Sequence, residues 1–180
     1  MDAQQITSAF NLSYHTYICF RGCFLNNNIP TNFINEGICF IVVNSLKKVG
    51  DIGHWVMIYI NQNNLYFFDS FGQMPAFYGG DITRIYDLYP HEKSVIFERP
   101  VQSFDSSVCG AYVIYFGYEM CRHSKPFLVK NSFSRFKREN DRKVVRYVDD
   151  KIGLKEVCCK NFCPRYMYNI PCKKNCNCNY

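Results

Sequence analysis

The chain has 180 residues, of which 48% are hydrophobic and 17% are aromatic. This is the length of a single domain, and its apolar content is enough to build a buried core, which excludes a wholly disordered protein. No apolar run approaches the roughly 18 residues that a membrane-spanning helix needs. The N-terminal residues show no basic segment followed by an apolar stretch, so a secretory signal is not expected.

The charge is unevenly distributed along the chain. Residues 1–120 contain 6 Lys and Arg against 10 Asp and Glu, whereas residues 121–180 contain 15 against 5. The basic C-terminal third is either a surface that contacts a polyanion such as DNA or a solvated face without a partner. The chain also has 11 cysteines, an odd number that cannot all pair within one chain. Most are expected to be thiols unless a metal binds them.

The first half of the chain predicts one helix and then a hairpin. A short helix is expected over residues 3–12, and a turn-rich loop over residues 20–30, where Gly22, three Asn and Pro30 interrupt regular structure. Residues 36–46 have the length of a helix, but their β-branched run leaves a strand open. Residues 54–60 and 65–70 are expected to pair as strands across the polar turn at 61–64.

The second half predicts a loop at residues 71–81, a short helix at 82–88, a third strand at 94–98 and a long apolar helix at 108–121. The last segment is apolar nearly all round, which is typical of a central buried helix, and Asp105, Ser106 and Ser107 precede it as candidate N-caps. Strands thus cluster in the middle with helices on either side. This order predicts an α+β fold, with a small mixed sheet beside a central buried helix that carries Cys109 at its N-terminus.

Four residues could form one reactive site. Cys109 lies in the first turn of the predicted buried helix, where the helix dipole and free N–H groups favour a thiolate. His54 opens one hairpin strand and Asp69 lies near the end of the other, so both reach the same end of the hairpin. Gln102 lies in the loop before the helix, where its amide can donate to an oxyanion. Each residue alone has an ordinary structural explanation, but together they match a thiol acyl-transfer site.

Three segments carry a resemblance to a known family: GHWVMIYI at residues 53–60, YFFDSFG at 66–72 and VQSFDSSVCGAYV at 101–113. In this order they resemble the adenain family, the adenovirus-type cysteine proteases, which belong to a wider clan with the SUMO and ubiquitin-like proteases. The segment FRGCFLNNNIP at 20–30, with VVN at 42–44, is especially similar to the versions encoded by adenovirus-like and polinton-type DNA viruses. The resemblance covers residues 18–122, approximately.

The resemblance implies a role for each candidate residue. Cys109 would be the nucleophile, His54 its paired base, and Asp69 the acid that orients His54. Gln102 and the backbone N–H of Cys109 would form the oxyanion hole, and Trp55 would shape the wall of the cleft. The chemistry implied needs no cofactor.

The implied function is that of a viral cysteine endopeptidase that cleaves structural precursor proteins during virion maturation. Such a protein is expected to be a monomer in the host nucleus or at the site of virion assembly, and within the virion. The alternatives are an isopeptidase that acts on ubiquitin or SUMO conjugates and a non-catalytic, DNA-binding virion protein. Adenoviral members can be activated by a short viral peptide that forms a disulfide with a cysteine located between the acid and the Gln in the sequence. Here residues 70–101 contain no cysteine, so that covalent route is not expected. A non-covalent viral peptide or DNA therefore remains as the expected activator.

The C-terminal part is divided by composition. The protease core is assigned to residues 1–125, a basic helical extension to 126–157, and a cysteine-rich basic tail to 158–180. Tail cysteines with the spacing C-x3-C-x8-C-x3-C could hold a structural zinc ion, and the alternatives are a disordered thiol-rich tail or oxidised cross-links. The four candidate ligands are Cys159, Cys163, Cys172 and Cys176. Basic residues interleaved with aromatics in the tail also suit a nucleic acid.

Overall fold

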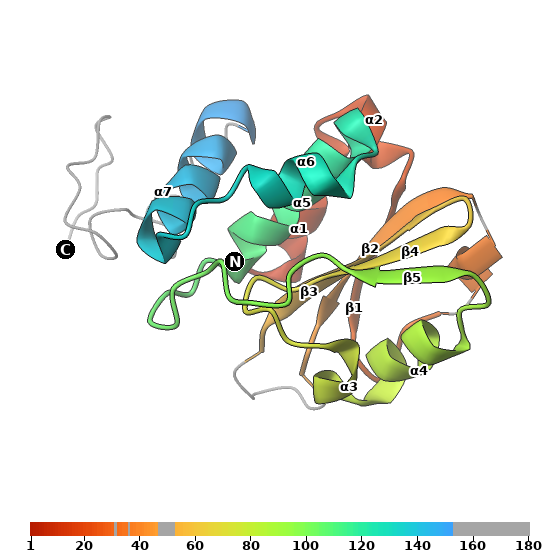
Figure 1. The fold of residues 1–180 in the computed structure, drawn as a ribbon. Helices are drawn as coiled ribbons and strands as arrows, with labels where there is room; N and C mark the ends of the chain where they lie inside the picture. Colours follow the sequence, from red (N-terminus) through yellow and green to blue (C-terminus); the bar gives the residue numbers. More distant parts are fainter. Residues whose placement is uncertain (31, 36, 47–52, 153–180) are drawn as a thin grey trace.

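A five-stranded mixed sheet lies at the centre of the computed structural model, which describes residues 1–30, 32–35, 37–46 and 53–152 (Figure 1). The middle three strands form an antiparallel meander, and each outer strand is parallel to its neighbour. In spatial order the strands are β1 (Phe20–Leu25), β2 (Ile38–Asn44), β3 (Trp55–Asn61), β4 (Asn64–Phe68) and β5 (Glu92–Val95). Among the described residues, no helix is long and apolar enough to cross a membrane.

Helices cover both faces of this sheet. On one face α1 (Ala3–Asn11) and α5 (Cys109–His123) pack on the sheet. The remaining helices on this side pack against α5: α2 (Tyr14–Tyr17), α6 (Pro126–Asn131), α7 (Lys137–Tyr147) and η2 (Val148–Ile152). The other face is covered by α3 (Pro75–Tyr78) and α4 (Gly80–Leu88). A short 3-10 helix, η1 (Asn32–Asn35), precedes β2. Figure 1 shows α5 between the sheet and α6.

The central strand β3 shows why the apolar run at residues 55–60 has no polar alternation. Met57 and Tyr59 point to the α5 side, whereas Val56 and Ile58 point to the α4 side, and all four are fully buried. A strand covered on both faces needs apolar residues at every position. Helix α5 lies close to α1 and β3 at Gly117, where a Cβ atom would lie 2.6 Å from the ring of Phe10 and 3.1 Å from Cε of Met57. At its other end α5 begins beside the start of β3, since the backbone of Trp55 bonds to Cys109.

The α+β fold, with a mixed sheet beside a buried helix that begins at Cys109, is confirmed. The predicted N-terminal helix and the hairpin are also present, as α1 and as β3–β4. The segment left open at residues 36–46 is the strand β2, because it pairs with β1 on one side and β3 on the other. Residues 126–152, within the predicted extension, form α6, α7 and η2.

Two local predictions were wrong. The expected loop at residues 20–30 begins with β1, since pairing with β2 outweighs the turn-forming residues. Gly22 instead accommodates an irregularity in that pairing, at a φ of 131° that disfavours other residues. The N-cap of α5 is Val108, and no described side chain caps the helix. Ser106 bonds back to the carbonyl of Ser103 through both its N–H and its hydroxyl, which closes the loop before the helix.

Candidate active site

The fold brings His54 and Cys109 into contact. Cys109 is the first residue of α5, and His54 directly precedes β3, on which α5 packs. The backbone of His54 is fixed by Ser45, which donates its N–H to the His54 carbonyl at 2.8 Å and accepts the His54 N–H at its hydroxyl at 3.0 Å. The imidazole of His54 and the thiol of Cys109 are close enough for each to shift the pKa of the other. A thiol and an imidazole 55 positions apart in sequence are thus paired by the packing of one helix on one strand.

Asp69 lies directly after β4 and holds the far side of the imidazole. Its carboxylate is fully buried, and Oδ1 lies 2.5 Å from Nε2 of His54. Oδ1 also accepts the N–H of Phe71 at 2.9 Å, while Oδ2 accepts the N–H of Gln73 at 2.8 Å and the hydroxyl of Tyr78 at 2.9 Å. These donors compensate the cost of burying a carboxylate and fix its orientation. Because Nε2 faces Asp69, Nδ1 is the ring nitrogen that remains for the thiol.

Aromatic rings hold the plane of the histidine. The ring of Phe71 stacks on His54 at a centroid distance of 4.6 Å, and the ring of Tyr78 lies at 6.3 Å with an interplanar angle of 18°. Only 13% of the His54 side chain is exposed. The imidazole is therefore fixed in position by hydrogen bonds at its edge and by rings at its face, as a general acid–base requires.

The electrostatics of the pair favour a thiolate and an imidazolium. Burial alone would lower the pKa of His54, but hydrogen bonds to Asp69 and Cys109 outweigh it and raise that pKa from 6.5 to about 9. Burial alone would raise the pKa of Cys109, but the hydrogen bond and charge of His54, with a hydrogen bond from the backbone of Trp55, lower it overall. A thiol whose pKa falls beside an imidazole whose pKa rises is the electrostatic pattern of a reactive cysteine.

Gln102 is fully buried and is held at both ends of its side-chain amide. Its Oε1 accepts the hydroxyl of Ser70 at 2.6 Å, and its Nε2 donates to the carbonyl of Ser106 at 2.8 Å. The backbone N–H of Gln102 also donates to the carbonyl of Ser70, at 3.0 Å. An amide nitrogen carries two hydrogens, so Nε2 has a second N–H besides the one that Ser106 accepts.

Trp55, which the family resemblance assigns to a cleft wall, contacts residue 1. Its indole N–H donates to the carbonyl of Met1 at 3.0 Å, and 8% of the residue is exposed. Met1 also packs on the first turn of α5, where a Cβ on Gly110 would lie 2.7 Å from the Cβ of Met1. Residue 1 thus lies against both Trp55 and the start of the helix that carries the thiol.

Several residues that contact the candidate site have little or no local sequence signal. Tyr78 lies in a segment predicted as a loop, and its bond to Asp69 depends on the helix α3 that folds back over the site. Met1 lies more than fifty positions from Trp55, so no local pattern indicated their contact. Ser70 offered one signal, because it directly follows the candidate acid Asp69.

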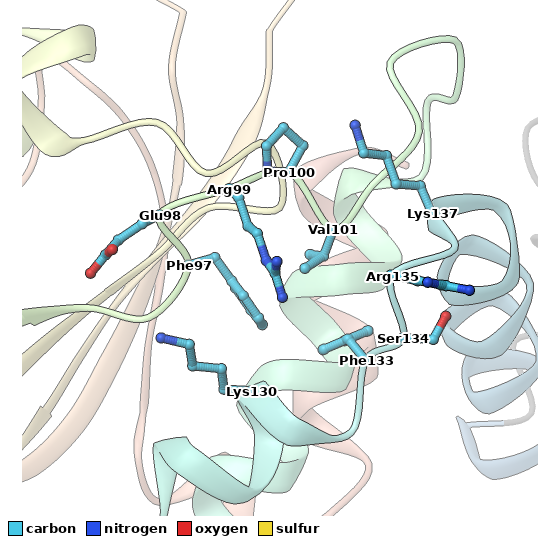
Figure 2. A pocket seen from close by; sticks show the side chains of 10 residues that line it. All are labelled: Phe97, Glu98, Arg99, Pro100, Val101, Lys130, Phe133, Ser134, Arg135 and Lys137. Carbon is cyan, nitrogen blue, oxygen red and sulfur yellow. The ribbon is translucent and has the colours of Figure 1, made fainter.

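A second feature is a basic cavity of about 630 Å³ beside the loop that leads to Gln102 (Figure 2). Its walls include the apolar side chains of Phe97, Val101 and Phe133, and its one acidic residue is Glu98. Among the residues that the structure describes, no carboxylate pairs with its cations. The cations at this cavity are Arg99, Lys130, Arg135 and Lys137.

The four candidate zinc ligands in the tail lie outside the described residues. Within the described ranges, no group of three or more His, Cys, Asp or Glu side chains could hold a metal ion. The zinc prediction for Cys159, Cys163, Cys172 and Cys176 stays a prediction.

Comparison with known proteins concerns the fold. No family model and no curated protein matches the sequence. Among solved structures, the chain is similar to ChlaDub1 from Chlamydia trachomatis, with a TM-score of 0.60 and 12% sequence identity. The match covers 83% of this chain and 89% of that chain. The chain therefore shares its overall fold with ChlaDub1. In that fold, the pairing of Cys109 with His54 at the start of α5 gives the architecture a candidate reactive centre.

Proposed function

We propose that this protein is a cysteine peptidase. Cys109 is the nucleophile, His54 the general acid and base, and Asp69 the residue that orients His54. The observation that carries this proposal is the series Asp69, His54 and Cys109 at the start of a buried helix. In it Asp69 bonds to His54, and His54 and Cys109 shift each other's pKa. The lowered pKa of the thiol and the raised pKa of the imidazole give the series the charges that nucleophilic attack needs.

The proposed reaction proceeds in two halves. The Cys109 thiolate attacks the carbonyl carbon of the substrate, a C–S bond forms, and the carbonyl oxygen becomes an oxyanion. The second N–H of Gln102 Nε2 and the backbone N–H of Cys109 donate to that oxyanion. The C–N bond then breaks as the His54 imidazolium gives its proton to the leaving amine. In the second half His54 takes a proton from water, the hydroxide attacks the thioester, and the acid and the thiolate are released.

We propose that the substrates are polypeptides. Within this class, we propose that they are viral structural precursor proteins. The order and content of the three segments that resemble the adenain family support this choice. The second candidate is an isopeptidase of ubiquitin or SUMO conjugates, which is supported by the fold shared with ChlaDub1, a protein whose name denotes a deubiquitinase. Both candidates use the same catalytic residues, so only the substrate distinguishes them.

The test is cleavage by the wild-type protein and by the Cys109→Ala variant. Precursor-derived peptides are compared with ubiquitin and SUMO carrying a C-terminal fluorogenic amide. We expect cleavage of the peptides by the wild type, and a loss of at least about 10³-fold in the variant, because the acyl-enzyme route disappears. Retained cleavage in the variant would exclude this mechanism, and cleavage of only the ubiquitin or SUMO substrates would select the isopeptidase.

Chemical labelling tests the nucleophile without a substrate. Iodoacetamide at neutral pH should label Cys109 faster than Cys23, since burial raises the pKa of Cys23 to about 11 whereas the pKa of Cys109 is lowered. His54→Ala should slow the labelling of Cys109 and leave Cys23 unchanged. Equal rates at the two cysteines in the wild type would contradict the proposed thiolate.

We also propose that the basic C-terminal third contacts DNA, with the basic cavity as part of the contact. The cations of the cavity lack carboxylate partners among the described residues, and phosphates would compensate their charge. DNA affinity should fall steeply as salt rises, and Lys130→Ala should lower the slope of log K against log salt by about 0.9 if that lysine contacts one phosphate. Lys93→Ala, outside the cavity, is the control. A protein that ignores DNA at low salt would leave the solvated-face interpretation.

A further inference from the structure

Helix α7 contacts the loop of residues 101–107, which carries the proposed oxyanion donor. Asp141 of this helix is fully buried, and its two carboxylate oxygens lie 3.4 and 3.3 Å from the backbone nitrogen of Ser103, whose N–H they accept. Oδ1 of Asp141 also accepts the hydroxyl of Tyr112 at 2.8 Å. The carboxylate thus joins the helix, the loop and the buried helix α5, to which Tyr112 belongs.

The other side of the same loop is held as well. The carbonyl of Val101 accepts the side-chain amide of Asn140 at 3.0 Å. It also lies 3.0 Å from the hydroxyl of Tyr112, whose single hydrogen it shares with Asp141. Asn140 is 2% exposed and its amide is further bonded to the backbone of Ser134 in both directions. The residues on both sides of Gln102 are therefore fixed by buried side chains of α7 and α5.

The exposed contacts between α7 and the loop carry less weight. Arg138 pairs with Asp105 at 2.6 Å, but both side chains are more than half exposed, and Lys137 lies over the ring of Phe104 at 4.3 Å. Exposed pairs of this kind contribute little to stability. A buried carboxylate is costly unless it is hydrogen-bonded, and the hydrogen bonds that Asp141 accepts include those from the Ser103 N–H and the Tyr112 hydroxyl. The buried pair, Asn140 and Asp141, is therefore the main connection.

We propose that Asp141 is a positioning residue for the reaction. Together with Asn140 it fixes the backbone on both sides of Gln102, so that the Gln102 amide is aimed at the developing oxyanion. This inference rests on the proposed peptidase function. It assigns part of the basic C-terminal third, which the family resemblance does not reach, to the catalytic machinery of the core. A displacement of about 1 Å in a catalytic group can lower a rate about 10²-fold. Loss of the Asp141 contacts, which would let the loop with Gln102 shift, should therefore lower kcat measurably.

The test is Asp141→Asn in the full-length protein. Asparagine keeps the size of the side chain but replaces one acceptor oxygen with a donor that cannot accept the Ser103 N–H. We expect kcat to fall about tenfold with KM little changed, as for loss of an interaction made in the transition state. The iodoacetamide rate at Cys109 should stay at the wild-type value, because it reports His54 and not the oxyanion donor. Asp150→Asn, the same change at an exposed position beyond α7, is the matched control.

A double variant tests the route of the effect. In the presence of Gln102→Ala, the change Asp141→Asn should cause no further loss of kcat, since both act on one interaction. An unchanged kcat in Asp141→Asn, a fully additive double variant, or a parallel fall in the labelling of Cys109 would overturn the proposal. If Asp141→Asn does not fold, Tyr112→Phe, which removes one hydroxyl from the same network, is judged by the same three readouts.

A measurement without catalysis separates this inference from the proposed function. Hydrogen exchange at the Ser103 amide should become faster in Asp141→Asn than in Asp150→Asn, whether or not the protein cleaves a peptide. If the wild type has no peptidase activity but exchange at Ser103 behaves as expected, the proposed function fails. The conclusion that Asp141 fixes the loop beside Gln102 then remains. If the wild type is active and exchange at Ser103 does not change, the inference fails by itself.

Discussion

The change Asp69→Asn should alter the pH dependence of the proposed peptidase on both sides of its maximum. Asp69 is fully buried, its Oδ1 lies 2.5 Å from His54 Nε2, and its hydrogen bond is the largest of the effects that raise the pKa of His54. Asparagine is nearly the same size but carries no charge. Burial, which lowers the pKa of His54, would then be opposed by fewer favourable interactions.

The size of the effect follows from the pKa of the wild-type histidine. A rise from 6.5 to about 9 corresponds to roughly 3 kcal/mol in favour of the imidazolium, at about 1.4 kcal/mol per unit. An opposite charge within a few ångströms typically accounts for about 1–3 units. The alkaline limb of the kcat/KM profile, where His54 loses its proton, should therefore move from near pH 9 to a pH lower by about one unit or more. The acid limb should move up, because without Asp69 the imidazolium is held less firmly beside the Cys109 thiolate and lowers the pKa of that thiol less.

The assay is kcat/KM across the pH range of both limbs for the wild type, Asp69→Asn and Gln102→Ala. Asp69→Asn should narrow the profile from both sides and lower its maximum at least about tenfold, because the carboxylate also sets the tautomer of His54. Gln102→Ala should lower the whole profile about 10²-fold and leave the limbs in place. An Asp69→Asn profile with unmoved limbs and an undiminished maximum would refute the reasoning, and another group would then hold the histidine.

Three further predictions concern the supports of the site and the core. Ser70→Ala removes the hydroxyl that donates to Gln102 Oε1 at 2.6 Å, so kcat should fall about tenfold with KM little changed, and an unaltered kcat would contradict a role in aiming the amide. Asn26→Ala removes an amide that bonds three backbone groups around the start of α4, so the free energy of unfolding in urea should fall by about 3 kcal/mol. A fall below about 1 kcal/mol would mean that water replaces those bonds. Phe68→Ala removes a fully buried ring stacked on Phe116 at 4.3 Å, so thermal or urea unfolding should show a loss of about 3–5 kcal/mol, and a smaller loss would indicate that the core closes over the cavity.

Local sequence patterns are enough to predict the parts of the fold that depend on neighbouring residues. The hairpin of β3 and β4 follows from two apolar runs around a polar turn, and α5 follows from a long apolar segment that a sheet and further helices can cover. The candidate residues His54, Asp69 and Cys109 could be selected because hairpin geometry and a helix start restrict where each can lie. The structure places Asp69 within hydrogen-bond distance of His54, and His54 beside Cys109.

The elements and contacts that depend on distant partners are visible only in the folded chain. Residues 20–25 contain a glycine and precede an asparagine run, and they form a strand because β2 offers a free edge to pair with. The bond from Tyr78 to Asp69 requires α3 to fold back over the histidine, and the bond from Asp141 to Ser103 joins residues 38 positions apart. Local sequence carries the preference of a segment for a helix, strand or turn, but a buried hydrogen bond between distant segments depends on how the whole core packs. The candidate residues could therefore be selected from the sequence, whereas the groups that hold them in place could not.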